Sequence, residues 1–170
     1  MSSCTPSPAA IPPLTAPAPA PRQAVYDYLR SVCSDVVVTQ GDFDEAGRWP
    51  DSAVLSIGGL RVGVCHGSQV VPWGDADALG ALQRRLGADL LVTGHTGAFK
   101  AYRHTDGGFV VNPGSATGAC SVASPAAGPP SFVLMDLAGG RATLYVYELG
   151  EGDEVKVDKI EVVLKEEALG

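Results

Sequence analysis

Three polar motifs, each placed behind a β-rich run, constrain the fold more than any other feature of this sequence. Asp42, His66 and His95 follow the runs 35–39, 60–65 and 89–93, respectively. Each lies beside a glycine, which lets the backbone turn sharply and approach a ligand closely. Ligands bind at the carboxyl ends of strands in α/β sheets, and Asp and His are common metal ligands. The motifs therefore predict an α/β fold with a metal-type site at one sheet edge, the alternative being ordinary turn residues with imidazoles bonded to backbone.

Composition excludes several classes of function. A chain of 170 residues with 45% hydrophobic and 18% charged residues fits one globular domain. Its 12 basic and 19 acidic residues give a net charge of -7, which disfavours nucleic acid and anionic membranes as partners. The cysteines Cys4, Cys33, Cys65 and Cys120 form no CxxC pair, which favours reduced thiols and a cytosolic location. No apolar stretch reaches the ~20 residues of a membrane helix, and no signal peptide is recognisable.

The first 22 residues differ from the rest of the chain. They contain seven of the thirteen prolines and almost no charge, which predicts a disordered leader over 1–22. The alternative is a docking peptide for a proline-reading domain. The folded domain is expected over 23–170.

Periodicity and turn signals predict helices followed by hairpins. Val25, Leu29 and Val32 recur at helical spacing, and a second helix begins after Asp75 and ends at Gly87. The predicted strands span 35–39, 53–57, 60–65, 89–93, 98–103, 109–111, 131–137, 141–149 and 154–164. This order is typical of an α/β sandwich with a mixed sheet.

The strand-end motifs resemble those of the calcineurin-like metallophosphoesterases. The motifs are Gly-Asp-Phe-Asp at 41–44, Cys-His-Gly at 65–67 and Gly-His-Thr-Gly at 94–97. The resemblance implies an αββα sandwich in which Asp, Asn and His hold two metals that activate water against a phosphate ester. It places Asp42 where the family has a metal-binding Asn, His66 at the fourth motif, and His95 at the first histidine of Gly-His-x-His.

Departures from the family pattern argue against catalysis. Phe43 stands where active members have a proton-donating histidine, and a phenyl ring does no acid–base work. Gly97 replaces the last metal histidine, and the first two family motifs have no counterpart before Asp35. Asp42, His66 and His95 are therefore expected to be a vestigial site that binds one divalent metal, Zn or Mn, weakly or not at all. The sequence predicts no cofactor and no enzyme activity, with a divergent metal-dependent phosphodiesterase as the alternative.

Three further segments are more specific than the histidines. Gln-Val-Val-Pro-Trp-Gly-Asp at 69–75, Asn-Pro-Gly-Ser-Ala-Thr-Gly-Ala at 112–119 and Pro-Ser-Phe-Val-Leu-Met-Asp at 130–136 resemble the family of small retromer subunits, over about 23–163. That family has the phosphoesterase fold without convincing catalysis. The resemblance implies a cytoplasmic protein, peripheral on endosome membranes, in a coat that returns cargo receptors from endosomes toward the Golgi.

The resemblance also implies two protein-binding surfaces. The first docks on the large α-solenoid subunit, vacuolar protein sorting-associated protein 35, and comprises Val70, Val71, Pro72, Trp73, His66 and His95. An apolar Val-Val-Pro-Trp run suits such a contact, although Trp73 could equally serve only to cover the helix after Asp75. The second receives regulators such as a Rab GTPase-activating protein, at Leu134, Tyr145, Tyr147 and Val157. Tyr145 and Tyr147 are two residues apart and therefore share one face of a strand. They could form a surface that binds a partner, or a tyrosine ladder that packs only within its own sheet.

The front of the chain departs from the family. Relatives begin with a strand, a helix and a strand inside the sheet, whereas a Pro/Ala-rich leader cannot donate regular ladder hydrogen bonds. We therefore expect this unit to be missing, through a shortened gene product or an incomplete gene model, with an exposed sheet edge and apolar surface as the result. His104, near a hairpin tip, is expected to be solvated.

Overall fold

The computed structural model describes residues 21–119 and 128–165. Most of the predicted leader, 1–20, lies outside these residues, and so does Cys120. The chain divides after Val38 into two units, which are described separately.

The first unit contains helix α1, Pro21–Val32, which confirms the helix predicted from its apolar spacing. The predicted strand over 35–39 is wrong, because residues 35–40 belong to no helix or strand and Val37 is 43% exposed. A β-branched run favours extended backbone, but a strand is stabilised by a neighbour with which it exchanges hydrogen bonds and side-chain contacts. No strand of the described ranges pairs with this run.

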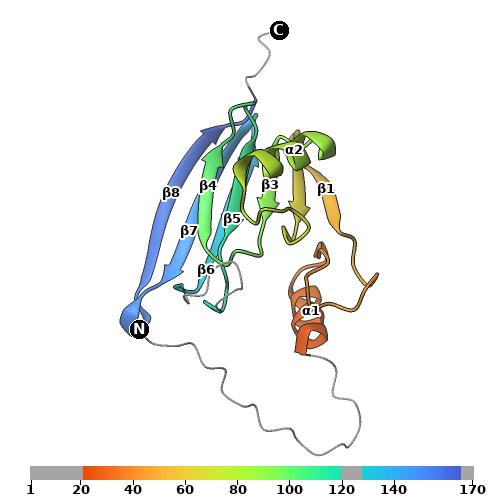
Figure 1. Cartoon of the computed structure of the whole chain (residues 1–170). Coiled ribbons are helices and arrows are strands. Elements are labelled where there is room, and N and C mark those ends of the chain that lie inside the picture. The colour runs from red at the N-terminus through yellow and green to blue at the C-terminus, as the bar shows by residue number, and fades with distance from the viewer. Residues whose placement is uncertain (1–20, 120–127, 166–170) are drawn as a thin grey trace, which may run out of the picture. The chain divides into compact units, whose positions relative to one another are not determined.

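The second unit is built on a five-stranded mixed sheet with strand order β1-β2-β3-β5-β4 (Figure 1). The strands are β1 (Ser52–Ile57), β2 (Leu60–Cys65), β3 (Leu90–Thr93), β4 (Phe99–Arg103) and β5 (Phe109–Pro113). The predicted hairpin turn at Gly58 and Gly59 is confirmed, and both glycines have positive φ. Since β2, β3 and β5 run parallel, their carboxyl ends meet at one edge of the sheet.

Helix α2, Ala76–Leu86, covers one face of this sheet. Asp75 caps it by accepting a hydrogen bond from the Ala78 amide, and Gly87 ends it in the left-handed conformation, as predicted. Leu79 and Leu82 on α2 pack against buried residues of β2, β3 and β5, namely Cys65, Leu91 and Val110. No helix in the described ranges is long and apolar enough to cross a membrane.

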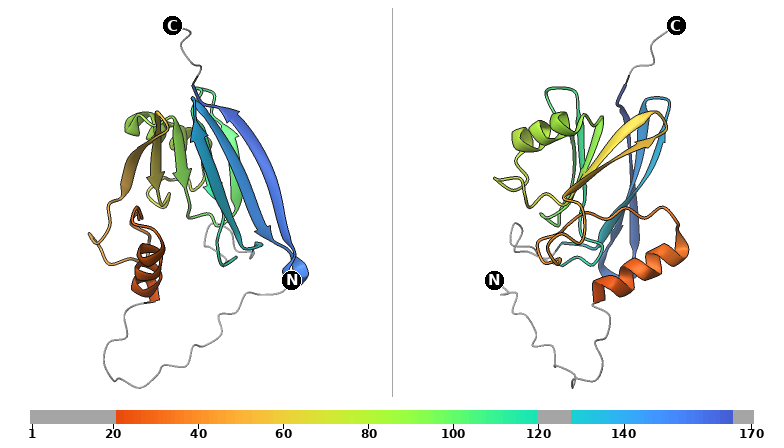
Figure 2. Two further views of the ribbon diagram at one scale, coloured as in Figure 1. Left: turned by 180° about the vertical axis from the view of Figure 1, so that it is seen from behind. Right: turned by 90° about the vertical axis from the view of Figure 1, so that its right-hand side faces the viewer.

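A three-stranded antiparallel sheet covers the opposite face (Figure 2). It comprises β6 (Ser131–Ala138), β7 (Arg141–Leu149) and β8 (Val155–Val163), with a short 3-10 turn, Glu151–Asp153, between the last two. Period-two alternation sends Leu144 and Ala142 inward, onto Val62, Leu90 and Val111 of the larger sheet. The predicted α/β sandwich with a mixed sheet is thereby confirmed, and its two sheets enclose the main core.

Candidate functional site

The three predicted strand-end residues meet at the edge where the parallel strands end. His66 directly follows β2, His95 follows β3 after one glycine, and a loop brings Asp42 to both. The Asp42 Oδ2 atom lies 2.9 Å from His95 Nδ1, and Oδ1 lies 3.6 Å from His66 Nδ1. The two imidazole centroids are 5.3 Å apart. The structure therefore assembles one carboxylate and two imidazoles, which we name the triad.

Tight loop geometry holds the triad in place. Gly67 has φ +102°, and a Cβ there would lie 2.5 Å from the Thr93 hydroxyl oxygen, so only glycine fits behind His66. On the other side, the Gly41 amide donates to Asp44 Oδ2 at 2.8 Å, which closes the turn that presents Asp42. His95 itself has φ 65°, a conformation uncommon for residues other than glycine.

Asn112, at the end of β5, is a positioning residue that sequence reasoning missed as an individual. Its side-chain nitrogen donates to the Gly94 carbonyl at 2.9 Å and to the Thr96 hydroxyl at 2.8 Å. Its side-chain oxygen accepts from the Gly114 amide at 2.9 Å. Asn112 thus ties the loop carrying His95 to the neighbouring strand. The sequence did offer a signal for Asn112, because a polar residue near the end of a β-rich run is the same pattern that indicated His66 and His95.

Electrostatics favour a neutral imidazole at His66. Burial lowers the pKa of His66, while the nearby Asp42 carboxylate opposes that shift. A neutral ring keeps a lone pair for a metal, which is the form that ligates. The adjacent Cys65 behaves differently, because burial raises the pKa of its thiol and keeps it protonated. Cys65 belongs to the core under α2.

The donor set suits one divalent ion. The ligand atoms of Asp42, His66 and His95 all lie within 4.8 Å of one another. Two imidazoles and a carboxylate, with water as a fourth ligand, are a familiar zinc set. Among residues 21–119 and 128–165 this is the single group of three such donors that could hold a metal, so the described residues fit one ion and supply no second centre.

An apolar loop lies beside the triad. The Trp73 ring contacts the His95 ring, with centroids 4.6 Å apart, and the indole nitrogen donates to the Ser68 carbonyl at 3.2 Å. Trp73 is still 45% exposed and Val71 is 76% exposed. The Trp73 ring therefore lies against the triad while part of it faces solvent.

Val70 corrects one part of the predicted docking surface. Its side chain is only 8% exposed and packs with Leu79 and Leu82 of α2 in the core. In the run Val-Val-Pro-Trp the first valine anchors the loop, and the second, Val71, faces outward. Val70 is thus unavailable to a partner, since its apolar surface is already covered by α2.

The four residues of the second predicted surface share the outer face of the three-stranded sheet. Leu134 lies opposite Tyr145, and Tyr147 lies opposite Val157. Phe132, which sequence reasoning missed, stacks on Tyr147 with centroids 4.8 Å apart and rings nearly parallel. Phe132 could have been predicted from the sequence, because it lies two residues before Leu134 and residues two apart share one face of a strand. We call these five residues the tyrosine patch.

His104 is buried, contrary to the predicted solvated position. It is 8% exposed, and its ring covers Gly80 of α2 so closely that a Cβ there would lie 2.8 Å away. The Asp106 amide donates to His104 Nδ1 at 3.3 Å, and His104 Nε2 lies 3.3 Å from Asp77 Oδ1. The β4–β5 hairpin tip is thereby fastened to α2.

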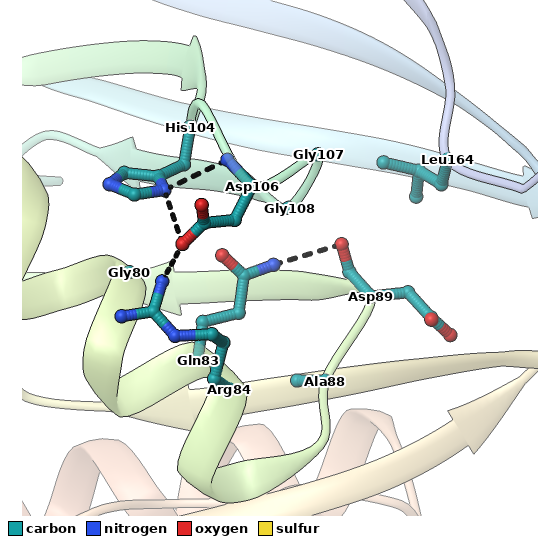
Figure 3. A pocket seen from close by; sticks show the side chains of 10 residues that line it. All are labelled: Gly80, Gln83, Arg84, Ala88, Asp89, His104, Asp106, Gly107, Gly108 and Leu164. Atoms are coloured by element: carbon teal, nitrogen blue, oxygen red, sulfur yellow. Dashed lines mark hydrogen bonds and ion pairs between the residues drawn. The ribbon is translucent and has the colours of Figure 1, made fainter.

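The same hairpin, α2 and the chain after β8 line a pocket of about 300 Å³ (Figure 3). Gln83 is one of its lining residues, is only 3% exposed, and donates to the Asp89 carbonyl at 3.0 Å. Arg84 forms an ion pair with Asp106 across the pocket. These polar groups bond to one another and to backbone, so they act as a structural junction between the helix and the sheet.

Comparisons with known proteins agree with this architecture. The profile described as "Calcineurin-like phosphoesterase superfamily domain" matches residues 19–140. "Vacuolar protein sorting-associated protein 29" of Schizosaccharomyces pombe is 43% identical over 141 residues, covering 81% of this chain and 74% of that protein.

Two crystal structures extend the comparison. Entamoeba histolytica Vps29 complexed with Zn²⁺ superposes with a TM-score of 0.75 at 40% identity, covering 82% of this chain and 76% of that one. Chaetomium thermophilum Vps29 complexed with a RaPID-derived cyclic peptide has a TM-score of 0.70 at 36% identity, with coverage of 84% and 75%.

Proposed function

The chain belongs to the calcineurin-like phosphoesterase superfamily and, within it, to the Vps29 family, and from this premise we propose that it works by binding proteins rather than by catalysis. It is a retromer-type subunit that acts in vacuolar protein sorting.

One observation carries the binding proposal: large apolar side chains stand exposed where a phosphoesterase needs polar catalytic groups. Phe43, next to Asp42, is 80% exposed, and Val71 is 76% exposed on the loop beside His95. Apolar side chains grouped around a site of this kind favour a protein interface over a phosphate-binding cleft. We call Phe43, Val71, Pro72 and Trp73 the apolar rim.

The chemistry of the triad supports the same conclusion. Phe43 supplies no proton to a leaving group, and Gly97 offers no side-chain donor to a second metal. Hydrolysis of a phosphate ester by this superfamily uses two ions that stabilise the attacking and leaving oxygens. With donors for one ion, the described residues lack that clamp, so we infer a pseudoenzyme.

The proposed partner of the apolar rim is the large α-solenoid retromer subunit, vacuolar protein sorting-associated protein 35. Val71→Asp is expected to weaken capture of that subunit at least about tenfold, because it places a charge where an apolar contact is desolvated. The stability of the isolated chain should stay unchanged, since Val71 is largely exposed. Calorimetric titration of the two purified proteins measures the effect.

A matched control separates the rim from general surface charge. Val155→Asp makes the same substitution at a 59% exposed valine on β8 and should bind as the unmodified chain does. Equal affinity of the Val71→Asp and Val155→Asp proteins would rule out the rim as the interface.

The alternative function, a divergent phosphodiesterase, has its own test. It would be favoured by manganese-dependent turnover of a bis-aryl phosphate that His95→Ala abolishes.

We propose that the tyrosine patch receives regulators, such as a Rab GTPase-activating protein. Stacked aromatic rings with exposed Leu134 and Val157 offer rigid apolar area at low entropic cost. A Vps29 relative that binds a cyclic peptide supports peptide recognition in this family. Through such contacts the chain would act at the cytoplasmic face of endosomes.

Tyr147→Ala is expected to weaken binding of that cyclic peptide about tenfold or more, because it removes the ring on which Phe132 stacks. Surface plasmon resonance with immobilised peptide measures the change. Tyr102→Phe, a tyrosine change on β4 in the other sheet, serves as the control and should leave binding intact. Unaltered binding by Tyr147→Ala would place the peptide elsewhere.

A further inference from the structure

We propose that Asp106 is a modification site, which isomerises spontaneously to isoaspartate through a succinimide closed by the Gly107 amide nitrogen, and that its ion pair with Arg84 slows this step. Asp106-Gly107 is the one Asp-Gly pair in the sequence, and no Asn-Gly pair occurs. The two residues lie at the tip of the β4–β5 hairpin (Figure 3). Because the reaction takes place within the chain, it needs neither a partner nor a cofactor. It is therefore independent of the triad and of both proposed protein-binding surfaces.

The step is an attack by a backbone amide on the side chain of the preceding residue. The Gly107 nitrogen forms a bond to the Asp106 Cγ atom and gives up its proton, and a carboxyl oxygen leaves as water. A water molecule then adds to the backbone carbonyl carbon of Asp106 and breaks the bond from that carbon to the Gly107 nitrogen. The chain now runs through Cβ and Cγ, and the former backbone carbonyl has become a free carboxylate. One water leaves and one returns, so the mass is unchanged and nothing is oxidised or reduced.

Glycine at position 107 removes the usual obstacle to this attack. A side chain there would shield the amide nitrogen and limit rotation of the backbone, and glycine has none. Gly107 has φ +87°, and apart from its chain neighbours no described atom lies within 4 Å of the position that its Cβ would take. The pocket of about 300 Å³ is lined by both Asp106 and Gly107. Among the described residues, the tip therefore has room for the ring and for the longer backbone of the product.

Two contacts of the tip restrain the reaction without preventing it. Arg84 of α2 pairs with the Asp106 carboxylate and fixes its orientation, and the Gly107 amide donates to the His104 carbonyl at 2.9 Å. Attack on Cγ consumes the Gly107 N–H, so this hydrogen bond is lost, and the carboxylate must leave Arg84 before an oxygen departs as water. The Arg84 and Asp106 side chains are 54% and 52% exposed, and ion pairs of such exposure contribute little. The restraint is therefore weak.

Isomerisation alters the junction between the hairpin and α2. The His104 amide donates to the Gly108 carbonyl at 2.8 Å, and this hydrogen bond spans the tip. Isoaspartate inserts a methylene into the backbone between these two residues, so their spacing no longer suits the bond. The same tip holds the His104 ring against Gly80 of α2. The modified hairpin therefore fits α2 less well than the original one.

The readout is a protein-isoaspartate methyltransferase, which transfers a methyl group from S-adenosylmethionine to the free α-carboxylate of isoaspartate. The whole folded chain is aged at neutral pH and physiological temperature, and samples are digested and assayed over time. Methyl acceptance should rise steadily, and fragmentation mass spectrometry should place the isoaspartate at Asp106. Asp106→Glu keeps the charge but closes no succinimide, so this variant should lose most of the signal. Absence of methyl acceptance in the unmodified chain, or an undiminished signal in Asp106→Glu, would overturn the proposal.

Two variants of α2 test the restraint. Arg84→Ala removes the ion pair and should raise the rate of isoaspartate formation about two- to fivefold, the range expected for a half-exposed pair. Arg85→Ala is the matched control, because it removes the neighbouring exposed arginine of the same helix and should age at the unmodified rate. Circular dichroism checks that both variants stay folded. Equal rates in the two variants would contradict the role of Arg84, and isoaspartate formed only in urea would show that the native tip does not react.

Discussion

Replacing Leu144 with alanine is expected to lower the free energy of unfolding by about 2–5 kcal/mol, the largest stability change foreseen for this chain. Leu144 is 0% exposed on the central strand of the three-stranded sheet and packs onto Val62, Leu90 and Val111. Truncation leaves a cavity between two sheets, which relax together only in part because each is held by its own hydrogen-bond ladder. Thermal melting should shift down by roughly 5–15 °C.

Leu134→Ala is the matched control for this prediction. It makes the same substitution on the neighbouring strand, but at a side chain that is 54% exposed on the outer face. Far less transfer free energy is lost and no cavity forms, so its cost should stay below about 1 kcal/mol. Equal destabilisation by both variants would contradict the assignment of the core to the space between the sheets.

Local signals predicted most of the second unit correctly. The hairpin at Gly58 and Gly59, the helix capped by Asp75 and the three C-terminal strands follow from turn residues and from periods of 3.6 and 2. These elements depend on contacts close in sequence. The run 35–39 is as rich in β-branched residues as the segments that do form strands, but it forms none. A strand needs a neighbouring strand to pair with, and the local sequence does not reveal whether one is present.

Burial of single residues was predicted less well. Val70 and Val71 are adjacent and chemically identical, yet one lies under α2 and the other faces solvent. His104 looked like a solvated tip residue, but Gly80 on α2 leaves room for its ring. Such outcomes depend on packing between distant segments. The triad was predictable because the parallel order of β2 and β3 brings their carboxyl ends together.

Asp42→Ala is expected to reduce Zn²⁺ affinity at least about 100-fold, because it removes the one anionic donor of the proposed site. The carboxylate neutralises part of the ion's charge and also lies against both imidazoles, at 2.9 Å from His95 and 3.6 Å from His66. Loss of the Asp42 carboxylate therefore removes one ligand, and it also removes the contact that orients the imidazoles of His66 and His95. Competition against a zinc-sensitive chromophore measures the change.

Asp77→Ala provides the matched control, because Asp77 also faces an imidazole, that of His104, but lies outside the triad. It should leave Zn²⁺ affinity unchanged. Equal loss of Zn²⁺ affinity in both variants would indicate general binding to surface carboxylates. Full retention of Zn²⁺ affinity by Asp42→Ala would show that the triad is not the metal site.

The Asp42→Ala protein should still capture the large subunit, since the apolar rim is built from Val71 and Trp73 rather than from the carboxylate. If the Asp42→Ala protein loses the metal but keeps the partner, metal binding at the triad and partner binding at the apolar rim are independent properties of the chain.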